Sequence, residues 1–332
     1  MHVVIRADGG PNIGYGHLVR TSALAGEARS RGHEVTYATT TPTAVKDTCP
    51  DGVSVVALPT RGEPGPFVDW IRAVDPDVVY ADAYPVNTRY QRAVRRHVPL
   101  VVAGDDARHT ICADAFVNGN IYAPDLDYDY TGAEPTWCLG SEHLLLRDEV
   151  TRLAGETPPW RETVSEVLVT MGGSDIRGQT PMVIRALDGL DASVTVVIGP
   201  GFSNGDAVRR TVDDVALNCT VVETPPNLPE LMFDADMAVT ACGSTSYELL
   251  ALGAPSVAVV QAENQRLIAE ALAERDLATV LPMNADASNL RTSIDGLIDD
   301  PVRRRRYRER GQSVVPGTGR KTVCDAVLGA VE

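Results

Sequence analysis

The chain has 332 residues, enough for two domains of ordinary size, and its 44% of hydrophobic residues supports full cores and excludes a disordered protein. Its formal net charge of −15 disfavours binding to nucleic acid or to an anionic membrane. No run reaches the roughly 18 apolar residues that a membrane span needs, and the chain enters a strand without a signal peptide. We therefore expect a soluble cytoplasmic protein.

The first predicted strand leads into a glycine-rich turn that carries a histidine. Val3–Ile5 is a short apolar run typical of a buried strand, and Leu18–Ala28 has helical spacing. Between them lie four glycines and, directly before the helix, His17. The free N–H groups and the dipole of such a helix start favour an anion, and an imidazole exchanges a proton near neutral pH. The loop therefore indicates chemistry beside a phosphate, with His17 as the candidate catalytic residue.

A structural role for His17 is the alternative. The loop matches neither the dinucleotide fingerprint Gly-x-Gly-x-x-Gly nor the P-loop pattern Gly-x-x-x-x-Gly-Lys-Ser/Thr. A single histidine at a helix start is often a cap or a satisfied structural group. The loop alone leaves both interpretations open.

The first half of the chain continues as alternating strands and helices, which predicts a parallel sheet covered by helices. Active groups are then expected where the strands end. Polar residues follow three of these strands: Arg6 and Asp8, Asp82 and Tyr84, and Asp105 with Asp106, the last two being typical of caps or turns. The predicted strands are Val3–Ile5, Val35–Ala38, Val53–Ala57, Val78–Ala81, Leu100–Ala103 and Ala115–Val117.

Paired prolines in the segment Gly155–Trp160 indicate a linker, after which a second α/β series begins. We expect a fold of two doubly wound, Rossmann-like domains, residues 1–157 and 163–332, with a ligand cleft between them. The strands predicted for the second domain are Val164–Met171, Val194–Ile198, Thr220–Val222, Met237–Ala241 and Ser256–Val260.

The most specific stretch of the second half begins where the strand Met237–Ala241 ends. Gly243 allows close approach of the backbone to a ligand, and the next three residues, Ser244, Thr245 and Ser246, open a helix with hydroxyls and free N–H groups that suit an anion. One turn later, Glu248 is placed to accept hydrogen bonds from a ribose diol. The alternative, without a ligand, is that the three hydroxyl residues only cap the helix and that Glu248 faces solvent.

The next buried strand ends in a group of amide and carboxylate side chains, which suits a hydroxyl-rich or amide-bearing sugar. These residues are Gln261, Glu263, Asn264 and Gln265. Because glycine, hydroxyls, acid, a Gly-x-Pro turn and a polar strand end occur in this order, we favour ligand binding over capping.

At this point the sequence resembles a family. The segment Gly243–Gln265 looks like the nucleotide-binding half of proteins with the GT-B glycosyltransferase fold. Over roughly residues 1–270 the chain resembles the pseudaminic-acid pathway hydrolases of the PseG and SpsG type, the UDP-2,4-diacetamido-2,4,6-trideoxy-β-L-altropyranose hydrolases. The other segments that carry the resemblance are Arg6-Ala-Asp8, Ile13-Gly-Tyr-Gly-His17, Gly104-Asp-Asp106, Leu139-Gly with Leu144-Leu-Leu-Arg147, and Met171-Gly-Gly-Ser-Asp175.

The resemblance implies a GT-B type nucleotide-sugar hydrolase that needs no cofactor and no metal. His17 maps onto the family's base, which would activate water for inverting attack at the anomeric carbon, and Tyr84 would supply an aromatic hydroxyl. UDP would lie mainly on the second half and its ribose near Glu248. Substrate-binding residues would be Arg6, Asp8, Gly14, Gly16, Gly172, Gly173, Gly243, Ser244, Thr245, Ser246, Glu248, Glu263, Asn264 and Gln265.

Two further functions remain open: a glycosyltransferase of the same fold, for which UDP release requires an acceptor, and a non-catalytic nucleotide-sugar binding module. A dehydrogenase is disfavoured because the first loop lacks the Rossmann fingerprint. The expected partner is a small UDP-sugar; nucleic acid and membrane are not expected, and no oligomeric state is predicted. Scattered cysteines and histidines, without Cys-x-x-Cys, argue against a zinc site.

Two patterns of charged residues lie outside the predicted site. Among the 30 basic residues only Lys46 and Lys321 are lysines, which together with the acidic excess suggests adaptation to high salt. The run Arg303–Arg306 lies among acidic residues, so we expect one solvated helix face.

Overall fold

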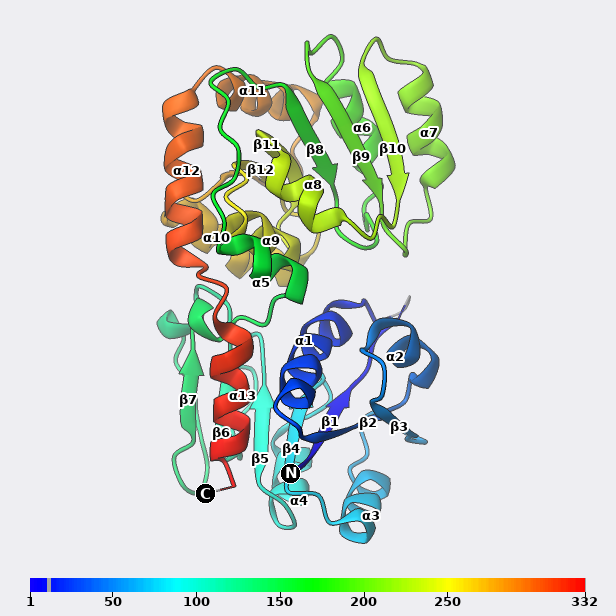
Figure 1. Ribbon diagram of the computed structural model, residues 1–332, viewed down its shortest axis with the longest axis vertical. Coiled ribbons are helices and arrows are strands. Elements are labelled where there is room, and N and C mark those ends of the chain that lie inside the picture. Colours follow the sequence, from blue (N-terminus) through cyan, green and yellow to red (C-terminus); the bar gives the residue numbers. More distant parts are fainter. Residues whose placement is uncertain (11–12, 332) are drawn as a thin grey trace. The chain divides into compact units, whose positions relative to one another are not determined.

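The computed structural model describes residues 1–10 and 13–331, which form two compact units (Figure 1). The first unit comprises Met1–Asp148 and Gly317–Glu332, and the second comprises Glu149–Pro316. Each unit is a parallel sheet with helices on both faces, so the predicted α/β class with two Rossmann-like domains is confirmed.

The sheet of the first unit has, within the described residues, seven strands in the order β3-β2-β1-β4-β5-β6-β7, all parallel. The strand order reverses between β1 and β4, which is where α/β sheets usually bind ligands. All six predicted strands of this half are present, and β7 is an addition. The strands are β1 (His2–Ala7), β2 (Glu34–Thr39), β3 (Ser54–Ala57), β4 (Val78–Asp82), β5 (Leu100–Ala103), β6 (Ala115–Asn118) and β7 (Thr136–Leu139).

Helices cover both faces of this sheet because strand side chains alternate between them. Val3 and Ile5 of β1 belong to the core under α1, whereas Val4 belongs to the opposite core, which contains Phe67 of α3 and Tyr90 of α4. The helices of this unit are α1 (Gly16–Ser30), α2 (Pro42–Thr48), α3 (Gly65–Val74), α4 (Thr88–Arg95) and α13 (Gly319–Gly329), with short 3₁₀ turns at Ala123–Asp125 and Ser141–His143.

The second unit has, in the part of the chain that is described, six parallel strands in the order β10-β9-β8-β11-β12-β13. The five predicted strands are present, and β13 is an addition. The strands are β8 (Glu166–Thr170), β9 (Ser193–Ile198), β10 (Asn218–Glu223), β11 (Met237–Ala241), β12 (Ser256–Val259) and β13 (Thr279–Leu281). The helices are α5 (Asp148–Ala154), α6 (Thr180–Ala186), α7 (Gly205–Asp213), α8 (Leu228–Asp234), α9 (Ser244–Ala251), α10 (Arg266–Glu274), α11 (Ala287–Ile298) and α12 (Pro301–Val314), with a 3₁₀ turn at Glu263–Gln265.

The observed units differ from the predicted division into residues 1–157 and 163–332. The last helix, α13, returns to the first unit and lies beside α1 and β6 (Figure 1). Its residues Val323, Cys324 and Val327 are buried in the same core as Leu18. Burial of this apolar face holds the C-terminal helix on the first unit.

The expectation that Arg303–Arg306 forms one solvated face is wrong for Arg304, which is fully buried. Its guanidinium donates to the backbone carbonyls of Leu297, Ile298, Arg161 and Glu162. It also lies over the ring of Trp160, with 5.7 Å from Cζ to the ring centroid. The arginine therefore fastens the segment that leads into β8 to the end of α11.

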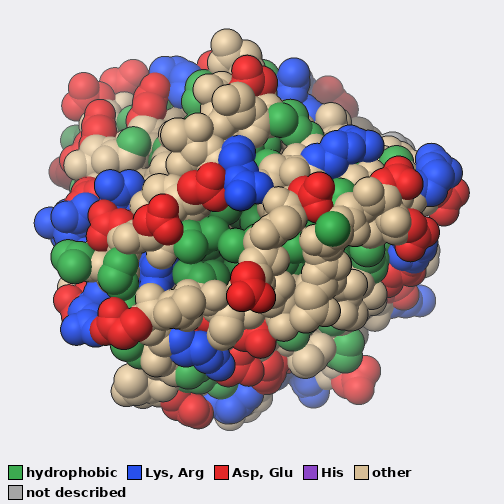
Figure 2. Space-filling model, turned by 90° about the horizontal axis from the view of Figure 1, so that it is seen from above, with side chains coloured by type: hydrophobic (Ala, Val, Ile, Leu, Met, Phe, Trp, Pro, Cys, Tyr) green, Lys and Arg blue, Asp and Glu red, His purple; other side chains and the backbone are tan. Residues whose placement is uncertain are grey.

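Three further observations concern membrane spans, cysteines and surface charge in the described residues. No described helix is long and apolar enough to span a membrane. Each of the six cysteines is a free thiol. On the face that Figure 2 shows, acidic and basic side chains are interspersed around a hydrophobic centre, so the acidic excess does not form one block there.

Replacing Arg304 by Met should lower the free energy of unfolding of the second unit by about 2–4 kcal/mol, because buried carbonyls lose their donors. Arg306→Met, at an exposed ion pair with Asp276, should cost less than about 0.5 kcal/mol. Urea denaturation followed by Trp160 fluorescence, with Trp70 and Trp137 replaced by Phe, measures both. Equal losses would contradict the role given to Arg304.

Candidate active site

The candidate site of the first unit lies where β4 and β5 end and α1 begins. Gly14, with a φ of +90°, and Gly10 form a tight bridge, and α1 starts at Gly16. His17 is therefore the second residue of α1, where it is 7% exposed and lines a pocket. A histidine in the first turn of a helix next to strand ends is placed to act on a ligand that the strand ends bind.

His17 is oriented by a carboxylate. Its Nδ1 lies 2.8 Å from Oδ1 of Asp82, the last residue of β4. Asp82 is fully buried. Burial alone would raise the pKa of Asp82, but the charges of Arg20 and His17 and their hydrogen bonds hold it below its usual range. An ionised acceptor at Nδ1 leaves Nε2 as the ring nitrogen for a ligand.

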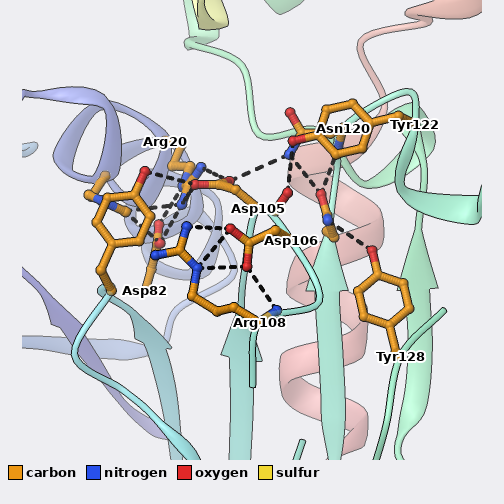
Figure 3. A network of polar contacts seen from close by, with 11 residues as sticks. Arg20, Asp82, Asp105, Asp106, Arg108, Asn120, Tyr122 and Tyr128 are labelled. Atoms are coloured by element: carbon orange, nitrogen blue, oxygen red, sulfur yellow. Dashed lines mark hydrogen bonds and ion pairs between the residues drawn. The ribbon is translucent and has the colours of Figure 1, made fainter. Parts of the chain in front are cut away.

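Arg20 connects this pair to a second carboxylate (Figure 3). Its Nε and Nη2 each lie 2.6 Å from an oxygen of Asp82. Its Nη1 lies 2.7 Å from Oδ1 of Asp105, on the loop that follows β5. Tyr122 holds that loop by donating to the Asp105 carbonyl at 2.7 Å. The residues His17, Arg20, Asp82 and Asp105 thus form one ionic network.

Tyr84 joins the network from the loop after β4. Its ring meets the His17 ring edge-on, with 4.8 Å between the centroids. Its hydroxyl donates to Oδ2 of Asp105 at 3.4 Å, and the guanidinium of Arg108 lies over its ring, with 5.2 Å from Cζ to the ring centroid. The predicted catalytic pair, His17 and Tyr84, is therefore brought together.

The pocket combines this polar network with an apolar wall. Its space is about 430 Å³ when the open solvent in front of it is included. The apolar part consists of Ala83, Val86, Val102, Ala103, Ile111 and Phe116. The polar part consists of His17, Arg20, Asp82, Tyr84, Gln91, Asp105, Asp106, Arg108 and His109.

Arg6 and Asp8 do not line this pocket. Both are fully buried and pair with each other at 2.8 Å. Asp8 also accepts hydrogen bonds from Thr40 and Arg61. Burial would raise the pKa of Asp8, but Arg6 and the hydrogen bonds of Thr40 lower it. The arrangement fits a buried link between β1 and the ends of β2 and β3.

In the second unit the helix α9 begins as predicted, directly after β11 and Gly243. Ser244 is exposed and Thr245 half-buried at its first turn. Ser246 is 2% exposed and donates to the carbonyl of Ala241 at 3.0 Å, so its hydroxyl is engaged by the backbone. Glu248 is 7% exposed, which contradicts the alternative that it faces solvent.

The residues after β12 are only partly brought to α9. The Gln265 amide is the nearest group to a Cβ built on Gly243, at 3.7 Å, and its Oε1 accepts from the backbone N–H of Gln261 at 2.7 Å. Asn264 is exposed, and Glu263 is exposed and pairs with Arg266 at 3.1 Å.

Gly172 and Gly173 follow β8 and pack against the end of the neighbouring strand β9. A Cβ on Gly199 would lie 2.7 Å from the carbonyl oxygens of both. Gly172 has a φ of +73°, a conformation that favours glycine. From the same loop, Asp175 accepts a 3.4 Å hydrogen bond from Gln261 after β12. The strand-end loops of this unit thus meet at one edge of its sheet.

Sequence reasoning left Arg20, Asp82 and Asp105 out of the predicted site residues. Two signals could have found them. Arg20 is three residues after His17, which places both on one side of α1. Asp82 ends β4 and Asp105 follows the adjacent strand β5, and the carboxyl ends of parallel strands share one sheet edge. Among the described residues no group of three or more His, Cys, Asp or Glu is arranged to hold a metal ion.

The comparisons with solved structures define the fold class. MurG from Acinetobacter baumannii has a TM-score of 0.73 at 14% identity, covering 99% of this chain and 100% of that one. The spinosyn forosaminyltransferase SpnP has a TM-score of 0.70 at 16% identity, covering 100% of both chains. The calicheamicin glycosyltransferase CalG4 has a TM-score of 0.69 at 16% identity, covering 99% and 98%. The fold is that of the GT-B glycosyltransferases.

The sequence comparisons confirm the resemblance to the pseudaminic-acid pathway hydrolases. The chain is 24% identical to the spore coat polysaccharide biosynthesis protein SpsG of Bacillus subtilis over 84% of this chain and 83% of that one. It is 23% identical to a UDP-2,4-diacetamido-2,4,6-trideoxy-beta-L-altropyranose hydrolase of Campylobacter jejuni over 83% and 97%. An uncharacterized protein of Methanocaldococcus jannaschii is 26% identical over 80% of this chain, which spans 57% of that protein's length. No protein-family model matches the chain.

Replacing Asp82 by Asn should destabilise the first unit by about 2–4 kcal/mol at neutral pH, because Arg20 loses a buried partner. The folded-state pKa of Asp82 is lowered, so its contribution is complete above the unfolded value of about 4 and is lost as the pH falls through the folded value. The difference from wild type should therefore shrink below about pH 4. Urea denaturation between pH 3 and 7 measures it, with Asp69→Asn at an exposed residue of α3 as control; a difference that is constant with pH would contradict an ionised Asp82.

Proposed function

We propose that this chain is a nucleotide-sugar hydrolase that cleaves a UDP-linked diacetamido-trideoxy amino sugar at its anomeric carbon with inversion. The products would be UDP and the free sugar, used for nonulosonic-acid or surface-glycan biosynthesis. The observation that carries the proposal is the buried contact between His17 and Asp82 at the wall of a pocket. The names of two relatives, a UDP-sugar hydrolase and a polysaccharide biosynthesis protein, support the substrate class.

His17 is the proposed base. With Asp82 accepting from Nδ1–H, Nε2 takes a proton from a water molecule as that water attacks the anomeric carbon. Asp82 stabilises the imidazolium that results, as the buried carboxylate does in catalytic triads. Tyr84 packs against the ring and keeps it in this orientation. The sugar is assigned to the pocket of the first unit.

UDP is assigned to the second unit. The N-terminus of α9 offers the backbone N–H groups of Ser244 and Thr245 and a helix dipole to the diphosphate, and Gly243 lets the ligand approach the backbone closely. The leaving diphosphate is stabilised by these donors in the transition state. Glu248 binds the ribose hydroxyls. We assign supporting roles in this site to Gly172, Gly173, Glu263, Asn264 and Gln265. Gly14, before α1, and Gly16, its first residue, are assigned to the site of the first unit.

A glycosyltransferase is the second candidate, because solved structures of similar fold include the calicheamicin glycosyltransferase CalG4 and the spinosyn forosaminyltransferase SpnP. A base beside the anomeric carbon activates an acceptor hydroxyl as readily as water. The two functions differ in one observable, since only a hydrolase releases UDP without an acceptor.

The test is incubation of the protein with UDP-, CMP- and GDP-linked amino sugars in the absence of any acceptor. Molar KCl is included because we propose that the acidic, lysine-poor composition is an adaptation to salt. We expect NMR to show release of UDP and of the sugar with inverted anomeric configuration. Release of UDP only after an acceptor is added would support the transferase, and binding without turnover would support a binding module.

His17→Gln should lower turnover at least about 100-fold, the usual scale for a general base, while the Kd for UDP changes little. His97→Gln, at an exposed histidine, serves as the matched control and should retain wild-type turnover. Steady-state kinetics and calorimetry with UDP measure the two effects. A parallel loss of turnover and of UDP binding would point to a structural His17.

Glu248→Ala should weaken UDP binding by about tenfold, the value of one charge-assisted hydrogen bond. Glu270→Ala, on the exposed side of α10, is the control. Calorimetric titration with UDP and with uracil measures the change, and thermal denaturation confirms that the variant is folded. A folded variant with unchanged affinity would show that the ribose assignment is wrong.

A further inference from the structure

Arg20 lies between two carboxylates and contacts both oxygens of each. Its Nε and Nη2 lie 2.6 Å from the two oxygens of Asp82. Its Nη1 lies 2.7 Å from Oδ1 of Asp105, and its Nη2 lies 3.4 Å from Oδ2 of the same residue. Figure 3 shows the guanidinium between the two acids. A planar guanidinium can satisfy two carboxylates in this way because its N–H groups are fixed in direction.

The same Nη2 also approaches His17, at 3.0 Å from Nδ1. This approach creates a choice between two tautomers. If Nη2 donates to Nδ1, the ring hydrogen is on Nε2, and His17 is unable to accept a proton from water at that atom. If Nδ1 carries the hydrogen and donates to Asp82, Nε2 has a free lone pair.

The hydrogens of Nη2 decide between the two. A guanidinium Nη2 carries two hydrogens, and the two carboxylate oxygens at 2.6 and 3.4 Å accept both. None is left for His17. In addition, an unprotonated Nδ1 would face the ionised Oδ1 of Asp82 at 2.8 Å, lone pair against lone pair. The Nδ1–H tautomer gives the hydrogen of Nδ1 and both hydrogens of Nη2 an acceptor, and it leaves the lone pair of Nε2 free.

We propose that Asp105, acting through Arg20, is a positioning residue that selects the Nδ1–H tautomer of His17 and so keeps Nε2 free as a proton acceptor. Asp105 does not need to touch the substrate for this role. It draws the second hydrogen of Nη2 away from the imidazole, while Asp82 accepts the hydrogen of Nδ1. The tautomer assignment stands on the contacts alone, whereas its consequence for turnover rests on the proposed hydrolase function.

Other charged and titratable groups around His17 do not compete for this hydrogen. Asp106 and Arg108, on the loop that carries Asp105, pair with each other, and Nε of Arg108 donates to both oxygens of Asp106. Tyr84 directs its hydroxyl to Asp105. His109 lines the pocket without a contact to Arg20 among those of the described residues. Asp105 is thus the acceptor that distinguishes the two states of Nη2.

The test uses two-bond ¹H–¹⁵N correlation spectra of the full chain labelled with ¹⁵N-histidine, in which the two ring nitrogens of each tautomer have different shifts. The spectrum of His17→Gln assigns the signals of His17. We expect the Nδ1–H tautomer to dominate in the wild type at a pH where the ring is neutral. In Asp105→Ala the Nε2–H tautomer should become a major population, and turnover should fall about tenfold, equivalent to a bias of about 1.4 kcal/mol.

Asp106→Ala is the matched control, because it removes a neighbouring carboxylate that binds Arg108 instead of Arg20. It should leave the His17 tautomer as in the wild type. A dominant Nε2–H tautomer in the wild type, or an unchanged tautomer in Asp105→Ala, would overturn the inference. If the tautomer responds as expected but no nucleotide sugar is cleaved, the inference holds and the proposed function fails.

Discussion

The buried carboxylate of Asp82 is the group on which the candidate site depends. It is excluded from water, and it stays ionised because Arg20 and His17 lie against it. A buried charge that lost these partners would cost several kcal/mol, so the three side chains fix one another. The orientation of the imidazole is therefore a by-product of charge compensation in the core, which makes the site rigid before any ligand binds.

Sheet topology explains why these groups meet. β4 lies between β1 and β5, so the loops after β4 and β5 come out side by side, next to the start of α1. The glycine loop between β1 and α1 places the backbone of His17 at that edge, so its imidazole is close enough to contact Asp82. The same physical rule places Gly243 and Gln265 together in the second unit, where β11 and β12 are adjacent. Each unit thus concentrates polar groups at one edge of a sheet whose interior is apolar.

Much of the fold was predictable, because buried parallel strands are short apolar runs separated by helical spacing. His17 was predicted from the glycine loop at the start of a helix and Tyr84 from the resemblance to a family, and the structure brings them together. The partnership of Arg20 with Asp105 was harder to foresee, since it spans 85 residues and depends on the order of the strands. Arg6 was expected near the ligand for the same reason as Tyr84, yet it points into the protein, because the direction of a side chain at a strand end is set by packing that the sequence does not display.

Two of the arginines make contacts that the overall composition does not explain. A lysine-poor, acidic chain suggests adaptation to salt, but salt gives no reason for an arginine whose nitrogens are held by several acceptors. Arg20 uses three nitrogens on two carboxylates, and Arg304 uses two nitrogens on four carbonyls. The three donor hydrogens of a lysine ammonium are all on one nitrogen, so lysine cannot contact acceptors that lie this far apart. At these two positions the contacts require a guanidinium group, independently of any adaptation of the surface to salt.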